Sequence, residues 1–262
     1  QVVYGIVGHK AHAKMLMIVR RERGRIRRYV HLGTGNYHSG TAKLYTDFGL
    51  LTCHEEIGED VQNLFQQLSG LGKVIKLQQC LNSPFTLHKQ LLKKIDREAA
   101  NAREGKPCGI DAKMNALTEP KIIRALYEAS QAGVPIRLVI RGTCCLRPGI
   151  PGISENIRVR SIVGRFLEHA RIYHFANDDQ PETWCSSADW MERNLFQRVE
   201  VAFPLLDAAI RKRVVREGIE VAWEDRAEAW ELRPDGTYEL IGPDNPKRAR
   251  HPQQRIRKLI NK

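Results

Sequence analysis

The order of apolar and polar positions along the chain predicts an alternation of strands and helices. Short apolar stretches predict strands at residues 2–7, 15–19, 29–32, 134–140, 172–175 and 183–185, and the stretch 134–140 is rich in β-branched residues. The basic stretch Arg20–Arg25 lies between the second and third of these strands. Because Gly24 suits a tight turn, we expect the two strands to form a hairpin.

Apolar residues at helical spacing predict four helices between these strands. Their expected extents are Ile57 to Gly70, Ser83 to Gly105, Thr118 to Gly133 and Pro204 to Gly218. Ser83 is expected to cap the second helix, with Pro84 in its first turn. The third helix leads directly into the strand at residues 134–140, and this order is typical of an α/β fold.

Composition narrows the classes of function. The 262 residues include 42 Lys and Arg against 30 Asp and Glu, and the net charge of +12 predicts an anionic partner such as nucleotide, polyphosphate, nucleic acid or a membrane surface. The 6 cysteines have no paired spacing, which favours reduced thiols and argues against a zinc site. No apolar run approaches the roughly 20 residues of a membrane span. The chain begins without Met in an apolar stretch, so we expect a fragment whose sheet has earlier strands.

Two segments share one sparse pattern of polar residues. The first runs from His12-Ala13-Lys14 to Gly33–Asn36, and the second runs from His169-Ala170-Arg171 to Ser186–Asp189. A base two residues after a histidine in a strand points to the same side as the imidazole. Phosphoryl transfer needs a nucleophile and cations, and neutral histidine offers an unprotonated ring nitrogen. The duplication predicts two half-sites that face each other across a pseudo-two-fold axis.

Further candidates follow from the two polar clusters. The glycines of Gly33–Asn36 permit close approach of the backbone to a phosphate, and Lys14, Asn36 and Arg171 are expected to contact phosphate. Asp189 is expected to orient a neighbouring imidazole by accepting its ring proton. Glu200, which is the only charged residue among the apolar positions 199–203, is a weaker candidate.

The chain resembles a known family in these same motifs. The H-x-K and G-[ST]-x-N elements resemble the phospholipase D superfamily, and residues 1–225 resemble the C-terminal catalytic part of bacterial polyphosphate kinases of the first type. The matching stretches are His12–Lys14, Tyr29–Asn36, Leu44–Asp47, Gly133–Pro135, Ile140–Gly142, Leu167–His169 and Ser186–Met191.

The resemblance implies a fold of two phospholipase D-like α/β lobes, each a mixed sheet flanked by helices, with the first lobe truncated. We expect the first catalytic domain over residues 1–79, the second over 80–225, and a basic, mobile tail over 226–262. His12 and His169 are expected to face each other across the interface between the lobes.

The resemblance also implies a reversible, magnesium-dependent transfer of the ATP γ-phosphate to polyphosphate through a phosphohistidine. His12 would be the phosphorylated nucleophile. Tyr45, Arg141 and His169 would contact the nucleotide and its phosphates, with His169 also acting as a catalytic donor or acid. His31 and His38 flank the glycine run, so chemistry alone leaves the choice of nucleophile open.

Cofactor, partners and location are implied in the same way. Protein contacts to Mg²⁺ are expected upstream of Gln1, with no metal site within this chain. The partners would be ATP or ADP, inorganic polyphosphate and further copies of the intact protein, with no specific nucleic acid and no transmembrane segment. The expected location is the cytoplasm, with peripheral contact to the inner face of the membrane.

Two departures separate the chain from phosphodiesterases of the wider superfamily. The aspartate usual after the lysine is absent, because Val19 and Ala176 occupy the corresponding places, and the second segment has Arg171 and Asp189 for Lys and Asn. A phospholipase D-type phosphodiesterase or nuclease is therefore the alternative enzyme. A non-catalytic polyanion-binding module is a third possibility, in which basic charge matters and His12 does not.

Overall fold

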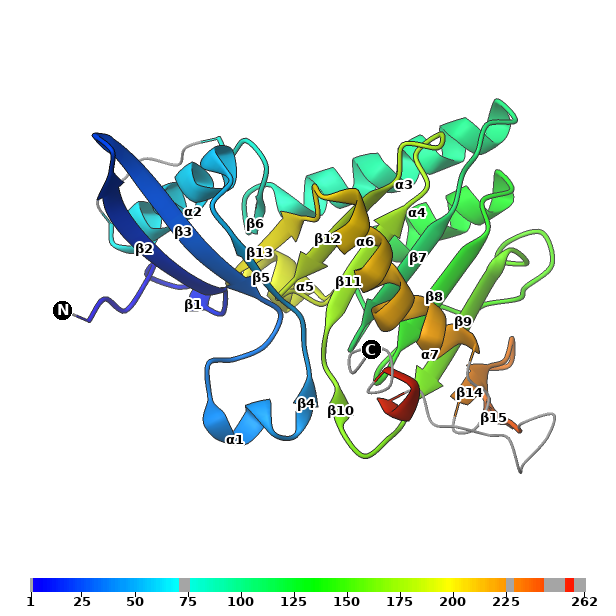
Figure 1. Cartoon of the computed structure of the whole chain (residues 1–262). Coiled ribbons are helices and arrows are strands. Elements are labelled where there is room, and N and C mark those ends of the chain that lie inside the picture. The colour runs from blue at the N-terminus through cyan, green and yellow to red at the C-terminus, as the bar shows by residue number, and fades with distance from the viewer. Residues whose placement is uncertain (1, 71–75, 225–228, 243–252, 257–262) are drawn as a thin grey trace.

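A computed structural model describes residues 2–70, 76–224, 229–242 and 253–256 and has a mixed α/β fold in two lobes (Figure 1). The N-terminal part contains β1 (Lys10–Ala11), β2 (Lys14–Glu22), β3 (Arg25–Gly33), α1 (Ser39–Ala42), β4 (Tyr45–Thr46), β5 (Gly49–Thr52) and α2 (Glu55–Leu68). Strands β2, β3 and β5 form a small sheet that packs on α2.

The larger lobe follows. Its helices are α3 (Leu87–Arg103), α4 (Pro120–Gln131), α5 (Glu192–Phe196), α6 (Ala208–Val215), a π-helical turn at Arg216–Glu220, and α7 (Val221–Glu224). Its strands are β6 (Leu81–Ser83), β7 (Ile110–Met114), β8 (Ile136–Ile140), β9 (Ile157–Ile162), β10 (Leu167–Glu168), β11 (Arg171–Phe175), β12 (Glu182–Ser186), β13 (Arg198–Pro204), β14 (Ala229–Leu232) and β15 (Tyr238–Ile241).

One mixed sheet organises this lobe. Within the described ranges it has 10 strands, in the order β1-β13-β12-β11-β7-β8-β9-β14-β15, with β6 also paired to β13. Strands β7, β8 and β9 run parallel, as do β1 and β13, whereas the other pairings are antiparallel. Strand β1 therefore leaves the first lobe and becomes an edge strand of the second.

Apolar side chains on the two faces of this sheet build two cores. Tyr173 and Phe175 of β11 pack with α3 and α4 on one face, and Ile172 packs on the other face with α6 and with α2 of the first lobe. This alternation follows from the two-residue period of a strand. Figure 1 shows α6 crossing the sheet on the side opposite α3. The second core thus joins the two lobes.

Several predicted elements are confirmed, and their ends have local causes. The hairpin β2–β3 pairs Lys14 with Gly33 at its base and Glu22 with Arg25 at its tip, and Gly24 has a φ of 80° in the turn. Helix α4 begins at Pro120, and the side chain of Glu119 accepts the N–H of Ile122 as its cap. The prediction of a mixed α/β fold in two lobes is confirmed.

Three local predictions need correction. Residues 2–7 form no strand, and Val2, Tyr4 and Val7 are exposed because no neighbouring strand pairs with them among the described residues. Helix α3 begins at Leu87 and not at Ser83. Ser83 belongs to β6, where it pairs with Glu200 of β13, and its hydroxyl donates to backbone carbonyls of the second lobe. The small sheet of the first lobe is antiparallel throughout its described strands rather than mixed.

The expected mobile tail also needs correction over part of its length. Strand β14 pairs with β9, and β15 pairs with β14, so residues 229–241 extend the large sheet. Buried Ala229 and Leu232 fix β14 against the core. Residues 243–252 and 257–262 of the predicted tail lie outside the described residues.

Candidate active site

His12 lies between β1 and β2 and is held at both ring nitrogens. Its Nδ1 lies 2.8 Å from Oε2 of Glu200 on β13, and Nζ of Lys14 lies 2.9 Å from its Nε2. Because Glu200 is fully buried and the ammonium can only donate, the network places the ring proton on Nδ1. The Nε2 lone pair of His12 is therefore directed toward a cation.

His169 repeats this arrangement in the second lobe. Its Nδ1 lies 2.8 Å and 3.1 Å from the two carboxylate oxygens of Asp47, and Nη1 of Arg171 lies 3.1 Å from its Nε2. The side chain of His169 is 11% exposed, against 19% for His12. Both imidazoles thus carry a carboxylate on Nδ1 and a cation on Nε2.

Strand register explains why each carboxylate meets its histidine. Strand β1 pairs in parallel with β13, so that Ala11 lies beside Val199 and the next positions are His12 and Glu200. Strand β10 pairs in parallel with β4, so that Glu168 lies beside Thr46 and the next positions are His169 and Asp47 (Figure 1). Each lobe therefore supplies the carboxylate for the histidine of the other lobe.

A hydroxyl group orients each carboxylate. Oγ1 of Thr34 donates to Asp47 at 2.7 Å, and Oγ of Ser187 donates to Glu200 at 2.5 Å. Each hydroxyl stands 13 residues before its carboxylate. No local pattern singles out Asp47, and this repeated spacing is the signal that could find it in the sequence.

The two half-sites act on each other electrostatically. Burial lowers the pKa of Lys14 from 10.5 to about 8; Glu200 opposes this shift and the charge of Arg171 adds to it. Nη1 of Arg171 also approaches the backbone carbonyl of Thr34 at 3.5 Å. Lys14 and Arg171 therefore belong to one site that spans the interface.

Asp189 does not orient an imidazole, which corrects the expectation for this residue. Its carboxylate binds the Arg171 guanidinium through two hydrogen bonds of 3.1 Å and 2.9 Å and accepts the N–H of Asn115 at 2.7 Å. Burial opposes the charge of Arg171, but its ion pair with Asp189 raises the pKa of the guanidinium. Asp189 therefore fixes Arg171 in place.

Arg141 lies one residue beyond the end of β8 and reaches the same region. Its Nε donates to Oδ1 of Asn115 at 3.2 Å, and Nδ2 of Asn115 donates to the carbonyl of His169 at 3.3 Å. The half-buried guanidinium is thus connected to the second half-site through one amide side chain.

Tyr45 lies against His169, with ring centroids 4.9 Å apart. It lines a cavity of about 460 Å³ together with Asp47, Lys113, Phe166 and other residues. Asn36 is exposed, and its side chain makes no hydrogen bond with other described residues. The structure therefore places Tyr45 at the site but does not bring Asn36 to it.

His31 lies on the open face of the small sheet rather than in a core. Its Nδ1 lies 2.7 Å from the hydroxyl of Tyr37, and burial lowers its pKa. No carboxylate contacts its ring among the described residues, so it lacks the arrangement that His12 and His169 share.

The side chains of the site can be compared with what a bound metal ion requires. In the described part of the chain, no group of three or more His, Cys, Asp and Glu side chains is placed to hold a metal ion. Glu200 and Asp47 already accept hydrogen bonds from an imidazole and a hydroxyl. The residues present do not fit a magnesium site of their own.

Among the described residues, no helix combines the length and the apolar character that a membrane span requires.

The fold and geometry define a duplicated two-histidine site in which the lobes exchange carboxylates. Comparison with known proteins gives the family. The model of polyphosphate kinase C-terminal domain 1 matches residues 1–74, and that of C-terminal domain 2 matches residues 80–253. This chain therefore belongs to the polyphosphate kinase family.

Individual relatives support this assignment. A polyphosphate kinase from Xylella fastidiosa is 60% identical over 93% of this chain and 35% of its own length, and one from Pseudomonas aeruginosa is 56% identical over 96% and 36%. The crystal structure of polyphosphate kinase from Porphyromonas gingivalis aligns with 99% of this chain and 40% of its own, with a TM-score of 0.92 and 34% identity. The chain thus spans little more than a third of the length of these relatives.

Proposed function

We propose that this chain is the catalytic region of an ATP:polyphosphate phosphotransferase in which His12 carries the phosphoryl group. The geometry of His12 is the observation that carries the proposal. Glu200 holds the proton on Nδ1, and Nζ of Lys14 lies 2.9 Å from Nε2. The nucleophilic nitrogen therefore lies beside a cation that can bind the phosphate. The relatives with 60% and 56% identity are polyphosphate kinases, which supports this assignment.

The proposed reaction has two steps. In the first, a bond forms between Nε2 of His12 and the γ-phosphorus of ATP, while the bond from that phosphorus to the β,γ-bridging oxygen breaks and ADP leaves with the electron pair. In the second, a terminal oxygen of polyphosphate attacks the phosphohistidine, and the nitrogen–phosphorus bond breaks. The reverse sequence forms ATP from polyphosphate and ADP.

The surrounding groups would act on charge and position. Lys14, Arg171 and Arg141 would stabilise the negative charge on the transferred group, because fixed cations in a partly dry site need no reorganisation. Tyr45 would pack on the nucleotide. His169 would exchange a proton with the phosphates; in the ground state its Nε2 accepts from Arg171, so it must gain a proton before it can act as an acid.

Magnesium binding, self-association and cellular location concern the intact protein as well as this chain. Mg²⁺ would arrive with the nucleotide, and we assign it no ligand here. Self-association belongs to the intact protein. A location in the cytoplasm is supported by the six cysteines, none of which forms a disulfide. Peripheral contact with the inner membrane face is supported by the net charge of +12.

The test uses the intact parent protein with and without His12→Ala. We expect acid-labile, base-stable label on the protein and label in polyphosphate after incubation with magnesium and γ-labelled ATP. The variant should lose both, while its nucleotide affinity stays within about tenfold, because a covalent role is separate from ground-state binding. Cleavage of a phosphodiester without either label would instead favour the alternative phosphodiesterase. Retention of transfer in His12→Ala would contradict the proposal.

A further inference from the structure

The tip of the β2–β3 hairpin concentrates positive charge away from the two histidines. Residues 20–28 contain six arginines and one glutamate, namely Arg20, Arg21, Arg23, Arg25, Arg27, Arg28 and Glu22. The proposed chemistry uses none of these residues. Arg21, Arg23 and Arg25 form no side-chain hydrogen bond or ion pair with other described residues, so their charge is free to meet a ligand.

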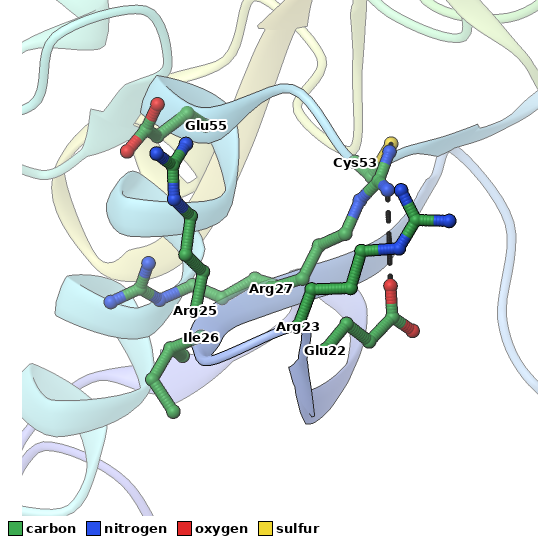
Figure 2. Close-up of a pocket in the computed structure, with 8 residues that line it drawn as sticks. Glu22, Arg23, Arg25, Ile26, Arg27, Cys53 and Glu55 are labelled. Carbon is green, nitrogen blue, oxygen red and sulfur yellow. Dashed lines mark hydrogen bonds and ion pairs between the residues drawn. The ribbon is translucent and has the colours of Figure 1, made fainter.

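This charge borders a pocket rather than a flat surface. An open pocket of about 750 Å³ is lined by Glu22, Arg23, Arg25, Ile26, Arg27, Arg28, Cys53 and Glu55. Figure 2 shows the guanidinium of Arg25 directed toward Glu55 and that of Arg27 beside Cys53. Four arginines against two glutamates leave the lining positive.

The register of the hairpin makes this arrangement costly for folding. Arg20 lies directly opposite Arg27 on the two strands, and like charges in such positions destabilise a sheet. Glu22 offsets this only in part, at 3.4 Å from Arg20 and 3.8 Å from Arg27. A local arrangement that opposes stability points to a functional requirement.

One face of the hairpin, which carries Glu22, Arg25 and Arg27 of the pocket lining, leads to the candidate active site. Lys14, Arg20 and Glu22 lie at even positions of β2 and share one face, and their partners include Arg27 and Arg25. Eight residue steps separate Lys14 from Glu22, which corresponds to about 26 Å along the strand. A linear polyanion that starts at Lys14 could therefore reach the tip if it is long enough.

The chemistry of the lining selects among polyanions. Arginine forks bind phosphate oxygens through paired hydrogen bonds. Proteins that hold single-stranded nucleic acid add aromatic side chains on which bases stack, and the pocket lining contains none. Ile26 is its one exposed large apolar side chain, which offers little to a lipid surface.

We propose that the arginine pocket at the hairpin tip is a distal binding site for long polyphosphate chains. It would hold a chain whose end lies at Lys14, and it would be out of reach of short acceptors. This inference rests on the proposed function for the identity of the polyanion.

The test compares two triple variants of the intact parent protein. Arg23→Gln, Arg25→Gln and Arg27→Gln remove charge from the pocket. Arg103→Gln, Arg124→Gln and Arg193→Gln remove the same charge from exposed positions on α3, α4 and α5. Binding of long-chain polyphosphate, tripolyphosphate, an RNA oligomer and phosphatidylserine vesicles is measured without nucleotide in a His12→Ala background. Failure of the phosphohistidine proposal would therefore not affect the result.

We expect the pocket variant to lose at least about tenfold in affinity for the long chain and less than about twofold for tripolyphosphate. The slope of log affinity against log salt concentration should become less negative by about two. This is roughly 0.7 for each of the lost phosphate contacts, as in single-stranded nucleic acids. The control variant should change neither affinity by more than about twofold.

Three results would overturn the inference. One is an unchanged affinity of the pocket variant for the long chain. Another is an equal loss in the control variant, which would mean that net charge alone acts. The third is a loss of binding to an RNA oligomer or to phosphatidylserine vesicles, with polyphosphate binding unchanged, which would assign the pocket to that ligand.

Discussion

Glu200 and Asp47 are the side chains on which the proposed chemistry of the two histidines depends. Each accepts the Nδ1 proton of an imidazole and thereby leaves Nε2 unprotonated. Lys14 and Arg171 then donate hydrogen bonds to the unprotonated Nε2 atoms of His12 and His169. The reactive state of each histidine is thus set by hydrogen bonds on both sides of its ring.

Glu200→Gln tests this role directly. The amide of Gln can donate to Nδ1 and place the proton on Nε2, so we expect kcat of the parent protein to fall by roughly hundredfold to ten-thousandfold, as for the carboxylate of a catalytic triad. KM for ATP should change little, because Glu200 does not contact the nucleotide in this proposal. Steady-state kinetics measures both.

The matched control is Glu192→Gln, which removes an exposed carboxylate from α5. We expect its kinetics to resemble those of the wild type. A large rise in KM of Glu200→Gln with unchanged kcat would mean that Glu200 contributes to binding and not to the state of His12.

The lowered pKa of Lys14 predicts that kcat/KM depends on pH. Burial lowers its pKa to about 8, so the ammonium is charged below that pH and neutral above it. We expect kcat/KM to fall as the pH rises through about 8, because the neutral amine no longer attracts phosphate. Lys14→Arg should shift this falling limb beyond the accessible range, since a guanidinium stays charged. An identical limb in both proteins would exclude Lys14 as its source.

Local pattern could predict only part of the site. The pairs His12–Lys14 and His169–Arg171 are two residues apart, so strand geometry alone brings each pair together. Glu200 stands 188 residues from His12, and no local pattern encodes that contact. Asp189 was assigned to an imidazole by analogy between the clusters, whereas it pairs with Arg171 because the guanidinium offers two donors.

At the scale of elements, the loop after β3 must pass close to β4 and β5. A Cβ on Gly35 would lie 2.1 Å from a carboxylate oxygen of Asp47. Gly35→Ala should therefore displace that carboxylate from His169, and we expect kcat to fall by about hundredfold, the scale of a displacement near 1 Å at a catalytic group. Steady-state kinetics of the variant measures this fall.

Gly242→Ala is the matched control, because a Cβ there meets no atom of the described residues within 4 Å. A Gly35→Ala protein with wild-type kcat would show that Asp47 can shift without consequence for the reaction.

Helix α2 carries a structural carboxylate. Asp60 is fully buried and accepts the backbone N–H groups of Gln78, Gln79 and Cys80 at 2.8, 2.7 and 2.7 Å. Asp60→Asn weakens these three bonds, and we expect the free energy of unfolding to fall by about 2 to 4 kcal/mol. Urea denaturation measures it. Exposed Asp96→Asn should change it by less than about 0.5 kcal/mol, and an equal loss in both variants would contradict this role for Asp60.

Elements with strong periodicity were predictable, and very short ones were not. Helices α2 and α4 and the hairpin β2–β3 follow from residue spacing and turn chemistry. Strands β1 and β10 have two residues each and form because a strand of the other lobe is present. Strand β14 was missed because the basic and proline-rich composition around it outweighed four residues of weak pattern.

At the scale of the whole molecule, the site exists only where the lobes meet. The first lobe supplies His12 and Asp47, and the second supplies His169 and Glu200. Neither half-site is complete without the other lobe, which gives the duplicated layout a structural reason. The duplication also makes the two imidazoles similar in geometry, and this leaves His169 as the main competitor of His12 for the role of nucleophile.

Two features favour His12. Its side chain is more exposed than that of His169, and its cation Lys14 forms no hydrogen bond with a carboxylate of the described residues, whereas Arg171 is held by Asp189. A phosphate can therefore approach Nε2 of His12 and pair with Lys14.

The most direct measurement is the position of the phosphoryl group in the parent protein. The protein is labelled with γ-labelled ATP, digested under alkaline conditions that preserve phosphohistidine, and the labelled peptide is identified by mass spectrometry. Our account predicts phosphate on the peptide that contains His12, and none on that peptide in Glu200→Gln under the same brief labelling. Phosphate on the peptide that contains His169 or His31, with the His12 peptide unlabelled, would contradict it.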